Sequence, residues 1–210
     1  MEDTTEGDNS VAIGTEAAKS NTNSNDYVAI GYEAGALGTN LSRNVYVGSQ
    51  AGKDNSDDEN VFLGYRAGYT ATGVTESIFI GSECGAGQGS TKPTGDRTIG
   101  IGRLALNYLQ DGDDNVAIGY RSGEYVTTGG QNVFVGAYTG STNSSSVSRS
   151  VFVGYQAAGG LGSKDGDENV AIGYRALREF DDAHNNVAIG YEAMQVVGDA
   201  SDNVAIGHGS

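Results

Sequence analysis

The feature that most constrains the fold is a short motif that recurs from one end of the 210-residue chain to the other. Residues 115–120 read NVAIGY, and the same six letters return at 169–174 and 186–191. One glycine, called the marker glycine here, holds the same place in each of twelve repeats: Gly14, Gly31, Gly48, Gly64, Gly81, Gly102, Gly119, Gly136, Gly154, Gly173, Gly190 and Gly207. Successive marker glycines lie 16 to 21 residues apart. A repeat this short cannot bury its apolar face alone, so the repeats must stack on one another.

The three residues before each marker glycine predict a short β-strand. The first is Val or Ile in all twelve repeats, and the third is Ile, Val or Leu. In a strand these two side chains share one face, and the residue between them lies on the other. That middle residue is also apolar in most repeats, with aromatic side chains at Tyr46, Phe62, Phe79, Phe134 and Phe152. A strand that is apolar on both faces is buried on both. We therefore expect one face to fill the coil and these five aromatic residues to form a seam with another chain.

The residues after the marker glycine predict a close corner. The third residue after each marker glycine is always small, namely Ala, Ser, Thr or Cys84, and a further glycine often follows it. Such residues suit a second short strand that packs tightly against the first, with the glycines at the corner. The rest of each repeat is polar and variable in length, as expected for turns. The sequence thus predicts one all-β domain over residues 1–210, a solenoid of about twelve coils that extends roughly 55 Å at ~4.8 Å per coil.

Composition limits the partners of the chain. The net charge of −15 disfavours binding to nucleic acid, because phosphate backbones carry charge of the same sign. No stretch is long and apolar enough for a membrane span, and the first residues lack the apolar core of a signal peptide. Cys84 is the single cysteine, so no disulfide forms within the chain. We expect neither nucleic acid nor membrane insertion.

The repeated Asn-Val-Ala-Ile-Gly-Tyr-x-Ala pattern resembles the head repeats of YadA-like trimeric autotransporter adhesins. It is also similar to repeats of phage tail-fibre proteins, and the resemblance runs from Ser10 to Gly207. It implies a left-handed parallel β-roll, three chains side by side as a homotrimer, and a role in attachment to a host receptor or glycan. The longer period, the aromatic middle residues and the absence of a coiled-coil stalk or membrane anchor in the chain favour a viral fibre over a bacterial adhesin.

The resulting functional hypothesis is a structural and adhesive shaft or head segment of a trimeric viral tail fibre, located in the virion and joined to other fibre domains. The alternatives are the head of a bacterial trimeric adhesin on the cell surface, a passive spacer without binding of its own, and a monomeric solenoid enzyme acting on polysaccharide. The loops at 88–96 and 140–149 are the best candidates for receptor contact, because repeat length varies there.

The sequence offers few catalytic candidates, and we expect neither an enzyme nor a bound cofactor. Gly100, Gly102 and Ala105 match a dinucleotide fingerprint, but a genuine one opens a helix, whereas these residues occupy ordinary repeat positions. The only histidines are His184, in a loop, and His208, in the final coil, and no catalytic constellation forms around either. Acidic turns at 54–59, 111–114 and 165–168 are most simply solvated, with a calcium site as the alternative.

Overall fold

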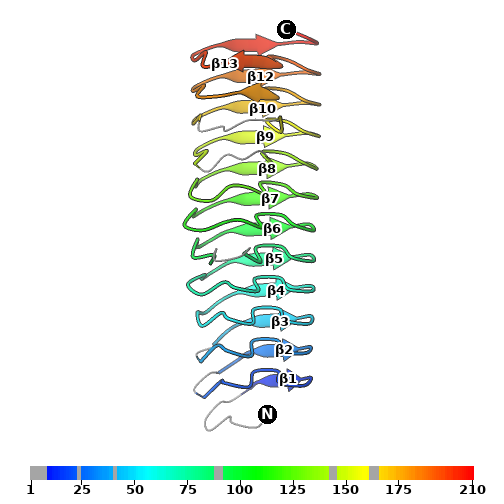
Figure 1. The fold of residues 1–210 in the computed structure, drawn as a ribbon, viewed down its shortest axis with the longest axis vertical. Helices are drawn as coiled ribbons and strands as arrows, with labels where there is room; N and C mark the ends of the chain where they lie inside the picture. Colours follow the sequence, from blue (N-terminus) through cyan, green and yellow to red (C-terminus); the bar gives the residue numbers. More distant parts are fainter. Residues whose placement is uncertain (1–8, 23–24, 40–41, 88–91, 142–145, 161–165) are drawn as a thin grey trace.

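The chain folds into a parallel β-solenoid in which each repeat forms one coil (Figure 1). The structure is a computed structural model that describes residues 9–22, 25–39, 42–87, 92–141, 146–160 and 166–210. Twelve three-residue strands form one sheet: β1 (Val11–Ile13), β2 (Val28–Ile30), β3 (Val45–Val47), β4 (Val61–Leu63), β5 (Ile78–Ile80), β6 (Ile99–Ile101), β7 (Val116–Ile118), β8 (Val133–Val135), β9 (Val151–Val153), β10 (Val170–Ile172), β12 (Val187–Ile189) and β14 (Val204–Ile206). Each strand occupies the three positions predicted before a marker glycine.

Equivalent residues of successive repeats pair directly across the sheet. Val116 aligns with Val133, and Ile118 with Val135, in parallel register. The ladder continues beyond the strands, since the amide of Gly136 donates to the carbonyl of Ile118 at 2.8 Å. Consecutive strands are neighbours throughout the sheet. The prediction of an all-β solenoid with one strand per repeat is confirmed.

The marker glycines allow the coils to approach closely. All twelve have φ between 131° and 140°, which side chains rarely tolerate. A Cβ atom on Gly119 would lie 2.5 Å from the carbonyl oxygen of Gly136 in the next coil. The glycine therefore serves both the bend after the strand and the stacking of backbone on backbone.

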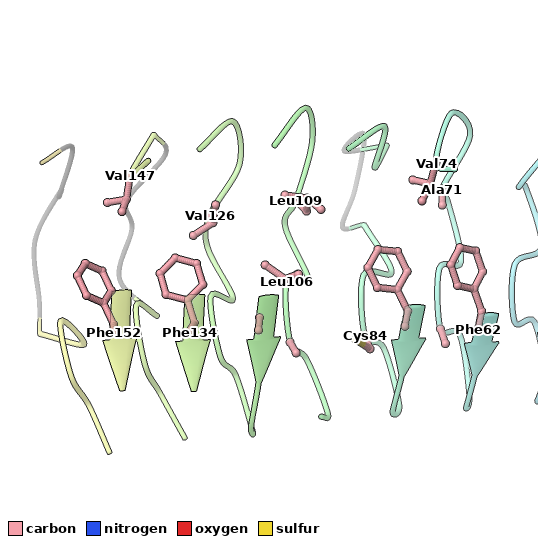
Figure 2. Close-up of a cluster of buried hydrophobic side chains, with 14 of the residues drawn as sticks. Phe62, Ala71, Val74, Cys84, Leu106, Leu109, Val126, Phe134, Val147 and Phe152 are labelled. Atoms are coloured by element: carbon pink, nitrogen blue, oxygen red, sulfur yellow. The ribbon is translucent and has the colours of Figure 1, made fainter. Parts of the chain in front are cut away.

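The middle residue of each strand points into the coil of its own chain. The rings of Phe62, Phe134 and Phe152 lie in the space between the sheet and the opposite turns (Figure 2). Phe62 stacks on Tyr46 and Phe79, with ring centroids 5.3 and 5.0 Å apart. All five aromatic side chains are at most 1% exposed. The prediction that Tyr46, Phe62, Phe79, Phe134 and Phe152 form a seam with another chain is wrong, because no surface of them is left for one.

Each coil fills its interior by matching a large residue with a small one. A Cβ atom on Gly68 would lie 2.5 Å from the ring of Phe62, six residues earlier in the same coil. In the coil whose strand has Gly100 at its centre, Leu106 stands at the position that Gly68 holds in the Phe62 coil. The Leu106 side chain fills the interior there (Figure 2). Gly68 is therefore needed at its position, because the ring of Phe62 occupies the space that a side chain there would need.

The second strand expected directly after the marker glycine is absent from the described coils, where that segment is a turn. The residue two after the glycine has φ near +55° in most coils, for example 52° at Glu33 and 54° at Arg66. A left-handed residue there prevents an extended strand. Among the described residues, a short second sheet occurs only in the last coils, from β11 (Glu179–Phe180) and β13 (Val196–Gly198).

A column of buried polar side chains runs beside the strands from β3 to β12, at the position before each of these strands of the large sheet. Asn115 accepts hydrogen bonds from the backbone and side-chain amides of Asn132, at 3.1 and 3.0 Å. Asn132 in turn accepts from the amide of Ser150, and Ser150 from that of Asn169. These side chains are fully buried, and their mutual hydrogen bonds fix the register of each coil on the next.

Replacing Gly119 with alanine should destabilise the fold, because the new Cβ atom meets a backbone carbonyl that cannot rotate away. We expect a loss of about 1–3 kcal/mol in unfolding free energy, measured by chemical denaturation. Gly73→Ala is the matched control, since a Cβ atom there makes ordinary contact with Thr94 at 3.5 Å. Equal losses in the two variants would contradict the close-approach argument.

Phe62→Ala should leave a cavity in the coil and cost about 3–5 kcal/mol in unfolding free energy. Tyr65→Ala, in the same coil but 47% exposed, should cost less than about 1 kcal/mol. Thermal and denaturant unfolding followed by circular dichroism would measure both. A Phe62→Ala variant as stable as the parent chain would show that the aromatic column is not the core.

Candidate interaction surface

The side of the sheet opposite the core presents two apolar rows, which we call the outer face. It consists of the first and third residues of the twelve strands, whose side chains point away from the buried middle residue. The most exposed of them are Val11, Ile13, Val47, Ile118, Ile172, Val204 and Ile206. In the middle of the sheet, Ile118 and Ile172 remain 38% exposed. Val, Ile and Leu thus line an uninterrupted apolar stripe along the solenoid.

The outer face is a sizeable apolar patch. Twelve strands at ~4.8 Å spacing, each three residues long at ~3.3 Å per residue, give a face on the order of 600 Å². Specific protein interfaces bury about 800 Å² on each partner, so a contact of that size would also include the residues that border the stripe. A continuous apolar surface of this size marks an interaction site in a folded protein.

An aromatic row lies at the end of the strands, just after the marker glycines in the second half of the chain. Tyr155, Tyr174 and Tyr191 stack at centroid distances of 5.5 and 5.0 Å, and His208 stacks on Tyr191 at 4.8 Å. Arg175 lies over the ring of Tyr174 at 5.0 Å. The row adds aromatic and cationic contact area beside the apolar stripe, and it is visible in the sequence as a recurring Tyr after the glycine.

A charged row lies at the other end of the strands. Arg97 contacts Asp114 of the next coil at 2.7 Å and also Asp113 at 3.4 Å. The Arg97 hydrogen bond lowers the pKa of Asp114. Arg43 and Arg149 make equivalent pairs with the acidic turns of their own following coils. These ion pairs bridge one coil to the next.

The same ion pairs explain what many carboxylates in the acidic turns contact. Besides its contact with Arg97, Asp113 accepts a hydrogen bond from the amide of Asp96 at 2.9 Å. Asp167 accepts one from the amide of Ser148, while His184 Nδ1 accepts from the amide of Asp167. Within the described residues, no group of three or more His, Cys, Asp or Glu side chains is arranged to hold a metal ion. These carboxylates serve the stacking of the coils.

The remaining sequence candidates fall at separate places. Cys84 is fully buried in the small-residue column, and burial raises the pKa of its thiol. Gly100 and Gly102 lie in and after β6, and a turn rather than a helix follows them. His208 stacks in the aromatic row, far along the chain from Cys84. Parts of both proposed receptor loops, residues 88–91 of the loop at 88–96 and residues 142–145 of the loop at 140–149, lie outside the described residues.

A polar network on the turns links three coils. Gln50 donates to Glu33 at 2.7 Å and accepts from Arg66 Nε at 2.8 Å. Lys53 contacts the same carboxylate oxygen as Gln50, with its Nζ 2.9 Å from Glu33 Oε2. The hydrogen bond from Gln50, followed by that from Lys53, lowers the pKa of Glu33 to about 2. The ionised carboxylate therefore holds Gln50 and, through it, the Arg66 side chain.

Comparison of the chain with protein-family models, with curated proteins and with solved structures gives no match. No helix that could cross a membrane occurs in the described part of the chain. The fold and its surfaces define the class of the protein as a parallel β-solenoid, and its function is inferred from those surfaces.

Glu33 should make the stability of the chain sensitive to acid. Because its pKa is lower in the folded chain than the ordinary value of 4.5, its contribution is complete above pH 4.5 and is lost as the pH falls towards 2. The difference in unfolding midpoint between the parent chain and Glu33→Gln should therefore shrink over that range. Gln50→Leu, which removes the main donor, should weaken the same pH dependence. A difference that does not change with pH would contradict the assignment.

Proposed function

We propose that the chain is a structural and adhesive segment of a trimeric fibre, in which the outer faces of three solenoids pack together. The observation that carries this proposal is the outer face itself, an apolar stripe that runs the whole length of the sheet without a charged interruption. In the ten inner strands of the twelve-stranded sheet the middle residue is already buried within the chain, so the Val, Ile and Leu rows are the surface that a second copy would bury.

A self-association of this kind suits the repeat architecture. Every coil presents the same pair of apolar positions, so identical chains can meet along the full length in one register. The resemblance of the repeats to trimeric adhesins and tail fibres favours three chains and a left-handed coil. Burying Val and Ile across chains stabilises by about 25 cal/mol for each Å² of apolar area. The charged and aromatic rows would then lie at the borders of the interface.

In the assembled fibre, the chain acts by presentation. A rod of stacked coils resists bending and holds its turns at fixed spacing, and three copies convert weak individual contacts into avidity. A viral tail fibre is the first assignment, with a bacterial adhesin head as the alternative. A binding assay distinguishes an adhesive segment from a passive spacer. If labelled chain does not attach to any host cell or glycan surface, the result favours the spacer.

The test of assembly is the solution mass of the chain and of outer-face variants, measured by light scattering. We expect the parent chain near three times the 21.6 kDa monomer mass. The double variant Ile118→Lys with Ile172→Lys should be monomeric and folded, because an unpaired lysine buried between chains is costly while both positions are half-exposed in the single chain.

Leu37→Lys is the matched control, since Leu37 is 52% exposed but lies outside the sheet. It should keep the mass of the parent chain. A parent chain that is stable as a monomer at all concentrations would overturn the proposal.

A further inference from the structure

Three coils, those of β4, β7 and β10, carry opposite charges at the two ends of their strand. In each of them an acidic residue lies two positions before the strand, and an arginine lies two positions after the marker glycine. The pairs are Glu59 with Arg66, Asp114 with Arg121, and Glu168 with Arg175. All six residues have a left-handed backbone, with φ between 54° and 64°. The same two corners of the coil therefore present a carboxylate and a guanidinium at three levels of the solenoid.

The three arginines share one local environment. Each guanidinium carbon lies over the ring of the tyrosine that precedes it, 5.2 Å from the ring centroid for Arg66, 5.4 Å for Arg121 and 5.0 Å for Arg175. The side chains of Arg121 and Arg175 are 37% and 31% exposed. Their ion pairs within the chain are long, at 3.6 Å and 3.9 Å. Stacking on the tyrosine therefore holds each guanidinium at this end of the strand, where a carboxylate of another molecule can reach it.

The three acidic residues lie at the opposite end of the strands. Each contacts an arginine of the preceding coil, at 2.8 Å for Glu59, 2.7 Å for Asp114 and 2.8 Å for Glu168. Their side chains nevertheless remain 47%, 41% and 48% exposed. An ionised carboxylate has acceptor sites for several donors. Each of them can therefore bind a second guanidinium from outside the chain.

A closed ring of three parallel chains brings unlike strand ends together. Its contacts are heterologous, so the arginine end of one chain meets the acidic end of the next. The three-fold symmetry sets equal coils at equal heights, and each of the three arginines then faces the acidic residue of the same coil in its neighbour. A shift by one coil in one direction sets all three arginines opposite other arginines, namely Arg43, Arg97 and Arg149. The opposite shift leaves Arg121 and Arg175 opposite the uncharged Gln131 and Asn185.

Two other coils hold acidic residues at both strand ends, Asp26 with Glu33 and Glu76 with Glu83. In the first of these coils Lys53 contacts Glu33 at 2.9 Å and offsets its charge. The in-register arrangement thus has three attractive levels against one fully repulsive level, and it is the arrangement in which all three arginines meet a carboxylate.

We propose that the chains of the fibre assemble parallel and in register, with the arginines of β4, β7 and β10 in one chain bound to the acidic residues of the same coils in its neighbour. This inference rests on the proposed three-chain assembly and adds the direction and the register of the chains. The apolar rows alone do not fix the register, because every coil presents the same pair of positions and a shift by one coil loses little contact. Exposed ion pairs are individually weak, but like charges that face one another disfavour the wrong arrangement.

The experiment is disulfide cross-linking of the double variant Asp114→Cys with Arg121→Cys. At ~3.3 Å per residue the stretch 114–119 alone spans roughly 16 Å, whereas a disulfide needs Cα atoms within about 7 Å, so this bond can form only between chains. We expect oxidation to give covalent species of two and three chains on denaturing electrophoresis without reductant. Cys84 is fully buried and does not compete. The matched control, Gln131→Cys with Arg121→Cys, joins coils one step apart and should cross-link at least about fivefold more slowly.

Charge reversal tests the ionic contacts separately. The triple variant Arg66→Glu, Arg121→Glu and Arg175→Glu should raise the concentration of half-assembly at least about tenfold by light scattering, because acidic residues then face one another. About 1 M salt should remove most of this difference. The triple variant Lys19→Glu, Lys92→Glu and Arg178→Glu changes the net charge equally outside the two strand ends, and should assemble like the parent chain.

The outcomes separate this inference from the three-chain assembly itself. A parent chain of three-chain mass in which the Asp114→Cys pair does not cross-link, or cross-links more slowly than the Gln131→Cys pair, would overturn the register and leave the fibre standing. Equal assembly of the two charge-reversed triple variants would overturn the ionic contacts. A parent chain that is monomeric at all concentrations would overturn both proposals.

Discussion

The whole structure depends on how closely one coil can lie on the next. At every marker glycine except Gly207, in the last coil, the backbone of one repeat rests on the carbonyl of the following repeat, and a single added carbon atom would collide with it. That contact sets the spacing at which the strands exchange hydrogen bonds in parallel register. The column of buried Asn, Ser and Thr side chains then fixes the register. Each side chain accepts a hydrogen bond from the amide of the next coil, and a slipped register would leave it unpaired.

The interior is governed by volume, both within a coil and between neighbouring coils. Phe62 needs Gly68 opposite it, and Gly100 allows Leu106 to enter the same space. The space beside Gly123 is taken by Leu106 of the preceding coil and Phe134 of the following one, so large and small residues complement one another along the column. The consequence for function is that the sheet has a free side. Its first and third residues, always β-branched or leucine, are left outside the core, and the outer face arises from this division.

The surface features follow from the same stacking. A residue type that recurs in consecutive repeats becomes a continuous row, as with Tyr155, Tyr174 and Tyr191 after the marker glycines. Opposite charges at one position of successive coils become ion pairs, as with Arg97 and Asp114. A break in a row has the opposite effect. Ala86 interrupts the row of fifth residues after the marker glycines, which holds Tyr69 and Asn107, and the interruption leaves a small pocket between their coils. Regular rows suit association along the rod, whereas an irregular position leaves a local recess.

The sequence by itself determined the number of coils, the position of every main strand and the role of the marker glycines, because a fixed repeat allows one way to align the copies. It did not determine which face of the strand is inside. Alternation separates the two faces, but both are apolar here, so the hydrophobic pattern alone could not assign them. The pairing of Phe62 with Gly68, and of Gly100 with Leu106, carried that information in the sequence, since matched sizes six residues apart indicate a shared interior. The pocket beside Ala86 and the turn that replaces the expected second strand were decided only by the tertiary structure. Both depend on left-handed backbone positions and on neighbours from other coils, which no local pattern specifies.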